Sequence, residues 1–240
     1  MGKKRSEHIN NVCVSINEQP PETLEGHLFY GLDCSDAEQV YYRDCLWDRN
    51  VRLIIADAVA GSGKTTMAVA IALMYVRYGI CDEAYYIRTP SSEGRLGFLP
   101  GDKSDKERVY MSPLIHTLIN LGENPVAVIN DDSYMNQKMG TGIFTTMTDV
   151  YMLGSDFSKK FIIIDEAQCM TSEQLKAVLT RCHDDCHVVV IGSSLQIQGI
   201  KKEESGLQHC IDHFKDKEWV RVCKLTKNYR GELSAWADKM

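Results

Sequence analysis

The sequence predicts an α/β fold in which a doubly wound, mostly parallel sheet carries helices on both faces. Short apolar runs rich in Ile and Val alternate with helical segments from residue 51 onward. These runs are apolar nearly throughout, as expected of strands that are covered on both faces. Alternation of such strands with helices is typical of a parallel sheet between two helical layers. The predicted strands are residues 51–57, 83–88, 161–166, 187–192 and 219–225.

Helical segments lie between these strands, and one domain accounts for most of the chain. The predicted helices are residues 65–78, 111–121, 171–182 and 205–214, and residues 142–148 are a further candidate strand. The third helix begins with TSEQ, from Thr171 to Gln174, which has the pattern of a capping box. Residues 1–35 are polar and contain the break QPPET. We therefore expect an N-terminal arm or extension over residues 1–35 and a single domain over residues 36–240.

The composition is that of a globular protein with an excess of acidic residues. Of 240 residues, 44% are hydrophobic and 25% are charged, and the formal net charge is -6. A dedicated nucleic-acid coat protein would be basic, so the bulk charge argues against that class and leaves room only for a local basic groove. No apolar run is long enough to span a membrane, and the N-terminus lacks the apolar core of a secretory signal. The nine scattered cysteines then indicate reduced thiols in a cytoplasmic protein.

A phosphate-binding loop is predicted where the first strand meets the first helix, in the segment AVAGSGKTT. Its glycines permit a turn whose backbone N–H groups point inward. Lys64 supplies a cation for the β- and γ-phosphates, Thr65 supplies a hydroxyl for Mg²⁺, and the helix N-terminus favours anions. Ala58 replaces the first glycine of the usual pattern, which a negative φ allows. The expected nucleotide-binding residues of the loop are Ala60, Gly61, Ser62, Gly63, Lys64, Thr65 and Thr66.

A second part of the site is predicted at the end of the strand in FIIIDEAQ. Asp165 and Glu166 follow four apolar residues, at the carboxyl edge of the sheet where ligands of such folds bind. Asp165 is placed to hold Mg²⁺ through water, and Glu166 to orient and deprotonate the attacking water. The alternative is that two acidic residues simply begin a loop.

Two glutamines are weaker candidates for the same site. Gln196 follows the strand in VVVIGSSLQIQ and is placed to contact the γ-phosphate or the attacking water. Gln39 lies upstream of the phosphate loop, and its amide could read an adenine edge because it both donates and accepts hydrogen bonds. A solvated loop residue and an exposed helical residue are the respective alternatives.

These motifs together resemble those of the PhoH-like ATPases, a branch of P-loop proteins related to superfamily 1 helicases. The likeness covers residues 36–230 and rests on AVAGSGKTT, IRTPSSEGRLGFLPGD, FIIIDEAQCMT, VVIGSSLQIQ and ESGL, of which GFLPGD is the most family-specific part. The resemblance implies a single RecA-like P-loop NTPase domain, hydrolysis of ATP with Mg²⁺ and ring-like oligomers such as hexamers. It also implies remodelling or unwinding of RNA or single-stranded DNA.

The resemblance also assigns roles residue by residue. Lys64 and Thr65 match the Walker A positions, and Asp165 and Glu166 match the Walker B positions. The other matches are Gln196 for the sensor glutamine, Gln39 for the adenine-reading glutamine, Arg88 for a nucleic-acid contact and Arg230 of LTKNYRG for the arginine that reaches the γ-phosphate. Arg95, in the segment after Arg88, is a further expected nucleic-acid contact, although interleaved acidic residues also fit a solvated loop.

Two motifs depart from the family pattern. The aspartate of the sensor motif is Ser193 in this chain. The Arg-Gly-Arg-Thr motif before the Walker B strand reads LGSD, from Leu153 to Asp156, and keeps only the glycine. If those arginines neutralise charge in the transition state of relatives, this chain needs another source or hydrolyses slowly.

Several functions remain open at this point. The first is an ATPase that remodels RNA or single-stranded DNA, and the second is an ATP-dependent switch that binds a protein partner, which the acidic net charge favours. A small-molecule kinase fits worse, because the DEAQ segment and Gln196 form a set that activates water. One core alone leaves the γ-phosphate facing solvent, so we expect head-to-tail assembly in which Arg230 or another basic residue completes a neighbouring site. The cluster RCHDDCH, from Arg181 to His187, offers zinc ligands as a minor alternative.

Overall fold

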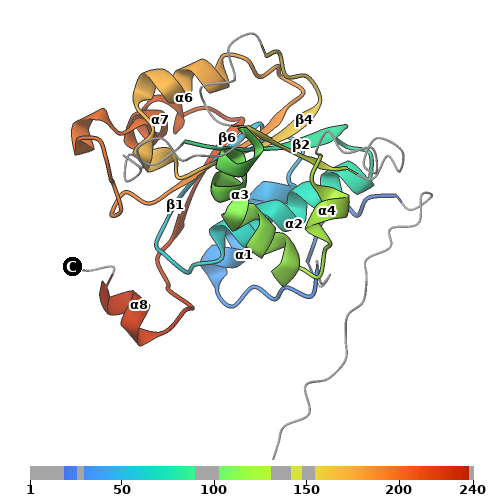
Figure 1. Ribbon diagram of the computed structural model, residues 1–240, viewed down its shortest axis with the longest axis horizontal. Helices are drawn as coiled ribbons and strands as arrows, with labels where there is room; N and C mark the ends of the chain where they lie inside the picture. The colour runs from blue at the N-terminus through green and yellow to red at the C-terminus, as the bar shows by residue number, and fades with distance from the viewer. Residues whose placement is uncertain (1–18, 26–29, 90–102, 131–141, 148–154, 238–240) are drawn as a thin grey trace, which may run out of the picture.

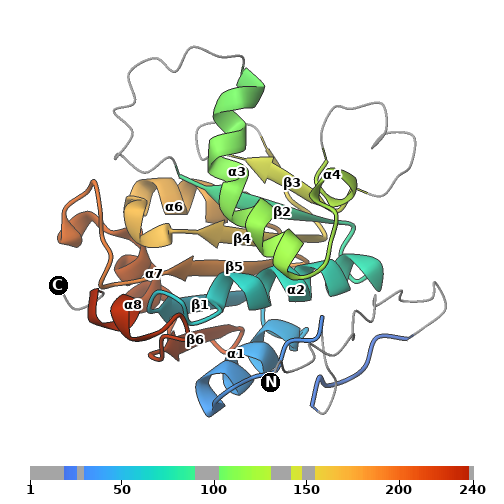
Figure 2. The same ribbon diagram turned by 60° about the horizontal axis from the view of Figure 1, so that its bottom comes forward.

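Six parallel strands form one sheet at the centre of the protein. The computed structural model describes residues 19–25, 30–89, 103–130, 142–147 and 155–237, with side chains omitted for residues 103–110. The strand order is β3-β2-β4-β5-β1-β6, as Figure 2 shows, and every neighbouring pair is parallel. The strands are β1 Leu53–Ala58, β2 Glu83–Arg88, β3 Phe144–Met147, β4 Lys160–Asp165, β5 His187–Gly192 and β6 Val220–Leu225.

Helices cover both faces of this sheet (Figure 1). Helices α1 (Ala37–Trp47), α2 (Lys64–Arg77), α3 (Lys103–Asn120) and α4 (Pro125–Val128) lie on one side. Helices α6 (Ser172–Leu179) and α7 (Gly206–Phe214) lie on the other side. The core therefore has two halves, one between the sheet and α1–α3 and one between the sheet and α6–α7. The predicted doubly wound α/β fold is confirmed.

The apolar runs of β4 and β5 form strands in which both faces are buried. Every residue of β5 is buried, and in β4 only Lys160 is partly exposed. Along β4, Phe161 and Ile163 point into the half of the core that contains α2, whereas Ile162 and Ile164 point into the opposite half. This alternation follows from the period of two in a strand, and it places Asp165 on the α2 side of the sheet.

Most element boundaries lie within two residues of the predicted ones. The predicted capping box begins α6: Gln174 N donates to Thr171 Oγ1 at 3.2 Å, and Thr171 N donates to Gln174 Oε1 at 2.8 Å. That helix ends at Leu179, three residues before the predicted end at Cys182. Helix α3 begins at Lys103 and not at the predicted Met111. The prediction missed the first eight residues because they are mostly polar and carry no helical apolar pattern. The candidate strand at residues 142–148 contains β3, and residue 148 lies outside the described residues.

Three helices that the sequence did not predict are α1, α4 and α8 (Glu232–Ala237). Helix α1 begins at Asp36, whose side chain accepts a hydrogen bond from Gln39 N at 2.8 Å. Helix α8 buries none of its residues and lies apart from the sheet, near the C-terminus (Figure 1). Because this helix has no buried face, its sequence lacks the periodic apolar pattern that predicts a helix packed on a core.

The described part of the N-terminal extension is irregular and packs on the core. Residue Leu24 is buried against the half of the core that contains α1. The indole Nε1 of Trp47 donates to Pro21 O at 3.0 Å. This segment therefore packs beside α1 and adds to that half of the core.

A search of the described helices for length and apolarity together finds none suited to crossing a membrane.

Candidate functional site

The phosphate loop joins β1 to α2 at the carboxyl edge of the sheet. Strand β1 ends at Ala58 and helix α2 begins at Lys64, so the predicted strand-to-helix elbow is present. Gly61 and Gly63 have φ values of 68° and 87°, in the region that favours glycine. Ala58 is not among the residues with positive φ, which explains why alanine is tolerated at the first position of the motif.

The loop leaves polar groups available for a phosphate. Among the described residues no side chain caps the N-terminus of α2, which leaves its first backbone N–H groups available for an anion. Lys64 Nζ donates to the loop carbonyls Ala58 O at 3.1 Å and Val59 O at 3.3 Å. The hydroxyl of Ser62 is buried and has no hydrogen-bond partner in the part of the chain that the structure describes. Lys64 thus folds over its own loop, at the place where a phosphate would offer better acceptors.

The segment that contains Arg230 lies on the phosphate loop of the same chain. Tyr229 N donates to Gly61 O at 3.0 Å. A Cβ atom added to Gly61 would lie 2.7 Å from Arg230 Cγ and 2.8 Å from Asn228 Oδ1. Position 61 therefore requires glycine for the close approach as well as for the turn. In this structure Arg230 lies on the phosphate loop of its own chain, whereas the sequence led us to expect that it serves a neighbouring subunit.

Helix α1 holds both the phosphate loop and the C-terminal segment. Gln39 Nε2 donates to Ser62 O at 2.8 Å, and Gln39 Oε1 accepts from Ser35 N at 2.7 Å. Thr226 N donates to Glu38 Oε2 at 2.7 Å, and the Tyr229 hydroxyl donates to the Asp36 carboxylate. The structure thus places Gln39 beneath the loop, where both ends of its amide are engaged. An adenine edge would have to share the amide with these partners.

The metal side of the site brings together two predicted residues that are 100 positions apart in the sequence. Thr65 Oγ1 lies 3.3 Å from Asp165 Oδ2. Glu166 N donates to Asp165 Oδ1 at 3.0 Å, and the Tyr86 hydroxyl donates to Asp165 Oδ2 at 2.6 Å. Burial raises the pKa of Asp165, and the Glu166 carboxylate raises it further; Tyr86, Arg88 and Lys64 oppose this shift.

This pair of oxygens fits a magnesium site. Magnesium prefers hard oxygen ligands and is usually held by one or two protein groups together with water and substrate phosphates. Thr65 and Asp165 would hold it here, one from the start of α2 and one from the end of β4. Among the described residues no cluster of three or more His, Cys, Asp or Glu side chains could hold a metal by protein ligands alone.

Glu166 lies beside this pair, and its carboxylate is partly exposed. Its backbone is left-handed, with φ 58° and ψ 35°, which turns the chain sharply after β4. Gln168 Nε2 donates to Glu166 Oε2 at 2.7 Å, and Arg88 Nη2 lies 3.7 Å from Glu166 Oε1. The residue expected to act as the base is therefore oriented by Gln168 and faces a cation at the end of β2.

Gln168 joins Glu166 to the loop after β5, a role that the sequence did not reveal. Its side chain is almost fully buried, and its Oε1 accepts from Ser193 N at 3.1 Å. Its Nε2 also approaches Gln196 O at 3.3 Å. The structure thus brings the backbone of Gln196 next to the Asp165–Glu166 turn. A glutamine directly after two acids in a buried segment is the signal that could have indicated this role.

Asp57 is a second residue that sequence reasoning missed. Ser194 N donates to Asp57 Oδ1 at 2.8 Å, and Ser194 Oγ donates to Asp57 Oδ2 at 2.9 Å. The sensor loop, in which the family aspartate is Ser193, is therefore attached to a carboxylate on the neighbouring strand β1. An acidic residue at the carboxyl end of the P-loop strand was visible in the sequence.

The expected nucleic-acid contact at Arg95 lies outside the described residues, and the LGSD segment lies partly outside them. Arg95 is not described, and neither are residues 148–154, which hold half of the LGSD segment. Two of the candidate zinc ligands in RCHDDCH have other partners: His183 Nε2 contacts Asp156 Oδ1 at 2.7 Å, and Cys186 Sγ donates to Phe157 O at 3.1 Å. The zinc alternative therefore finds no ligand set in the part of the chain that is described.

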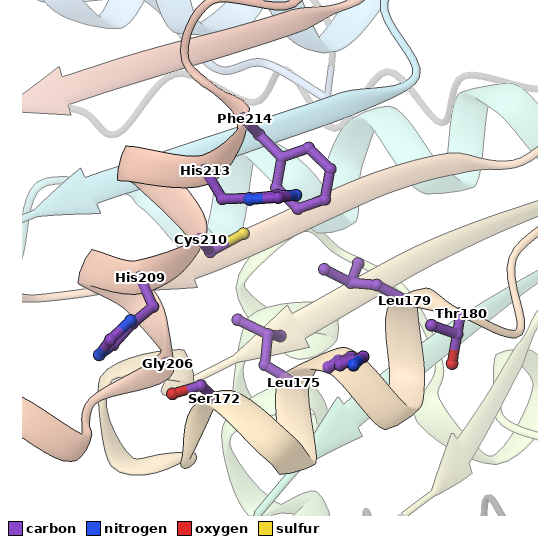
Figure 3. A pocket seen from close by; sticks show the side chains of 10 residues that line it. Ser172, Leu175, Leu179, Thr180, Gly206, His209, Cys210, His213 and Phe214 are labelled. Atoms are coloured by element: carbon purple, nitrogen blue, oxygen red, sulfur yellow. The ribbon is translucent and has the colours of Figure 1, made fainter.

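A separate hollow of about 500 Å³ lies between α6 and α7 (Figure 3). Leu175, Leu179, Cys210 and Phe214 line it, so its wall is largely apolar. It is on the sheet face opposite to α2 and contains none of the phosphate-loop residues. A site for a charged nucleotide has to be sought at the loop instead.

A parallel sheet whose first strand runs through a phosphate loop into a helix, with a threonine hydroxyl facing a carboxylate two strands away, defines a P-loop NTPase. A family model described as "PhoH-like protein" matches residues 32–238. The chain belongs to this family, and the resemblance seen in its motifs is confirmed.

Known relatives are longer than this chain. A PhoH-like protein of Mycobacterium tuberculosis (strain ATCC 25618 / H37Rv) is 33% identical over 168 residues, which cover 70% of this chain and 46% of the relative. Protein PhoH of Escherichia coli (strain K12) is 30% identical over 180 residues, 73% of this chain and 48% of the relative. The chain thus spans about half the length of the curated relatives it matches. The Sulfolobus solfataricus SWI2/SNF2 ATPase core in complex with dsDNA aligns with a TM-score of 0.46 at 13% identity, over 80% of this chain and 45% of that one.

Proposed function

We propose that this protein hydrolyses ATP with Mg²⁺ and uses the reaction to remodel or unwind RNA or single-stranded DNA. The observation that supports it best is the approach of Thr65 Oγ1 to Asp165 Oδ2 at the mouth of the phosphate loop, with Glu166 as the next residue. Residues 36–240 form the catalytic unit in this proposal, and residues 1–35 extend it. The eight described cysteines are free thiols, which suits a cytoplasmic protein.

In the proposed hydrolysis, different residues of the chain bind the phosphates and activate the water. The amides of the phosphate loop bind the triphosphate, and Lys64 leaves the Ala58 and Val59 carbonyls to bind the β- and γ-phosphates. Bound magnesium would neutralise charge on the same phosphates. Glu166, oriented by Gln168, takes a proton from water as the water oxygen bonds to the γ-phosphorus. The bond from that phosphorus to the bridging oxygen breaks, and the bridging oxygen leaves with ADP.

Arg88 offers a route from a nucleic-acid backbone to this chemistry. It ends β2 at the same sheet edge as Asp165, with which it is paired in register, and it lies 3.7 Å from the Glu166 carboxylate. A phosphate of RNA or single-stranded DNA bound at Arg88 would compete with Glu166 for the guanidinium. Arg95 belongs to the same proposed contact.

Assembly into a ring, such as a hexamer, is part of the proposal. The contact of Arg230 with Gly61 supports a role for Arg230 at the γ-phosphate of its own chain. A basic residue of a neighbouring subunit would then add to the site.

Replacement of Glu166 tests the hydrolytic role. Glu166→Gln keeps the size of the side chain and removes the base, so we expect ATP turnover to fall at least about a hundredfold. Nucleotide binding should remain, whereas Lys64→Ala should lose both binding and turnover. Turnover is measured by phosphate release, and binding by titration with a fluorescent ATP analogue.

The matched control is Glu218→Gln, which neutralises an exposed glutamate before β6. It should behave as the wild type does. Equal loss of binding in Glu166→Gln and Lys64→Ala would contradict the assigned roles.

The nucleic-acid part needs a separate measurement. RNA and single-stranded DNA homopolymers should stimulate turnover of the wild-type protein, and the stimulation should weaken as salt rises. Arg88→Gln should weaken polynucleotide binding, measured by fluorescence polarisation without nucleotide, and lower the salt slope by about one.

Arg52→Gln is the control, because Arg52 precedes β1 at the opposite edge of the sheet and pairs with Asp184. If no polynucleotide changes the turnover of an active wild-type protein, the protein-partner switch becomes the better explanation.

A further inference from the structure

Tyr86 is a buried tyrosine at the metal side of the site. It lies in β2 with 1% of its surface exposed, within the half of the core that contains α2. Its hydroxyl donates to Asp165 Oδ2 at 2.6 Å, the shortest of the three hydrogen bonds described for that carboxylate. A hydroxyl in this apolar setting needs a partner, and a carboxylate is a strong one.

The geometry leaves the Asp165 carboxylate little freedom. An ionised carboxylate can accept about four hydrogen bonds. Three of these positions are taken by the Tyr86 hydroxyl from β2, the Thr65 hydroxyl from α2 and the Glu166 N–H from the turn after β4. Among the donors that the structure describes, these three therefore hold the carboxylate in one orientation and leave one acceptor position for a ligand.

Tyr86 and Thr65 have different relations to a metal. Thr65 begins α2 and would itself hold the ion. Tyr86 projects from the sheet beneath Asp165 and, through its buried ring, fixes the carboxylate from the side of the core. Its hydroxyl acts on the metal only through Asp165.

We propose that Tyr86 is a positioning residue whose hydroxyl locks the Asp165 carboxylate and thereby makes the nucleotide site selective for magnesium over calcium. The proposal rests on the proposed function, because it concerns the ion that accompanies the nucleotide. Magnesium requires near-ideal octahedral geometry at short distances, whereas calcium accepts more ligands in flexible geometry. A carboxylate held in one orientation can accept hydrogen bonds from the ordered water shell of the smaller ion, whereas a carboxylate free to rotate can replace that water and bind the larger ion through both oxygens.

Tyr86→Phe is the test, since it removes one oxygen and keeps the ring that packs in the core. Binding of a fluorescent ATP analogue is titrated with Mg²⁺ and, separately, with Ca²⁺, and a parallel titration in EDTA gives metal-free binding. We expect Tyr86→Phe to need about tenfold more Mg²⁺ for half-maximal binding, the usual effect of losing a partner of a metal ligand. The Ca²⁺ midpoint should change less, so the ratio of the two midpoints falls. Metal-free binding should stay as in the wild type.

Tyr75→Phe is the matched control. Tyr75 is equally buried, and its hydroxyl donates to Trp47 O at 3.2 Å, away from the loop. This variant loses a buried hydrogen bond without touching Asp165, so its ratio of Mg²⁺ to Ca²⁺ midpoints should equal that of the wild type.

The outcomes separate this inference from the proposed function. A wild-type protein whose ATP binding ignores Mg²⁺ overturns the proposed function. If the wild type depends on Mg²⁺ but Tyr86→Phe keeps its Mg²⁺ midpoint, the proposal about Tyr86 is overturned. An equal change in both metal midpoints, or the same change in Tyr75→Phe, also overturns it, because it would reflect a loss of packing and not of selectivity.

Discussion

Single buried polar side chains define this site at the scale of the residue. Asp165 is a carboxylate inside an apolar core, and such a group is tolerated only when hydrogen bonds compensate its lost hydration. The buried amide of Gln168 is compensated in the same way. It donates to Glu166 Oε2 and Gln196 O, and it accepts from Ser193 N. The residues recognisable as Walker motifs are thus supported by residues that no motif identifies.

His187 is a buried titratable residue at the opposite edge of the sheet, and it carries a pH prediction. Its ring packs on Tyr75 and Phe161, with centroids 4.8 Å and 4.9 Å away, and its Nε2 finds no hydrogen-bond partner among the described residues. Burial lowers the pKa of His187 from 6.5 to about 4, against the raising effect of the Leu46 and Val51 backbone. Below pH 6.5 the unfolded chain therefore binds a proton that the folded chain does not.

The folded state should lose stability as the pH falls from about 6.5 to 4. The loss attributable to His187 is about 3 kcal/mol in the free energy of unfolding when the window is complete. His187→Phe keeps a ring between Tyr75 and Phe161 and removes the titration, so its stability should depend less on pH. Denaturant unfolding at a series of pH values measures this difference.

His209→Gln serves as the control, since His209 is an exposed histidine on α7. An identical pH dependence of stability in His187→Phe and the wild type would show that burial does not shift the titration as described.

At the scale of the element, the strands and α2 were predicted well and α1 was missed. The strands carry continuous apolar runs, and α2 begins at a glycine-rich turn, so local sequence signals mark them. Helix α1 is an edge helix with polar residues along much of its length, and its function lies in contacts far along the chain. Its Glu38 binds Thr226, and its Gln39 binds Ser62. Pairings across such separations leave no local pattern.

Helix α3 illustrates how a local rule can be outweighed. Pro113 lies inside this helix, although proline removes a backbone hydrogen bond and usually ends a helix. Leu114 and Leu118, one and five residues later, are fully buried in the core. Packing of these side chains stabilises the helix across the proline, which the sequence could not indicate.

At the scale of the whole molecule, the order of the strands creates the site. Strand β5 lies between β1 and β4, so the phosphate loop and the Asp165–Glu166 turn are two strands apart at one edge. The helix α2 crosses that gap on one face and carries Thr65 to Asp165. Two hydrogen bonds attach the loop after β5 to the chain on either side of it. Ser194 N donates to Asp57 in β1, and Ser193 N donates to Gln168, which follows β4.

Assembly is the prediction that belongs to this scale. If subunits complete one another's sites in a ring, the mass measured by light scattering with ATP should be a multiple of the 27.1 kDa of one chain. Turnover per chain should then rise with protein concentration until assembly is complete, because each site needs its neighbour.

Full turnover by a monomer at every concentration would contradict the ring. It would agree with Arg230 serving its own phosphate loop, as its contact with Gly61 suggests.

The sequence alone determined the fold class, the phosphate loop and the Asp165–Glu166 pair, because these depend on local features: apolar runs, glycines at a turn and acids at a strand end. Only the tertiary structure decided that Tyr86 bonds to Asp165, that Gln168 bridges two loops and that Arg230 rests on its own Gly61. The physical reason is that a contact between residues far apart in the sequence, such as Tyr86 and Asp165 at 79 positions, depends on strand order and register. Those are set by packing of the whole core, which no short stretch of sequence encodes.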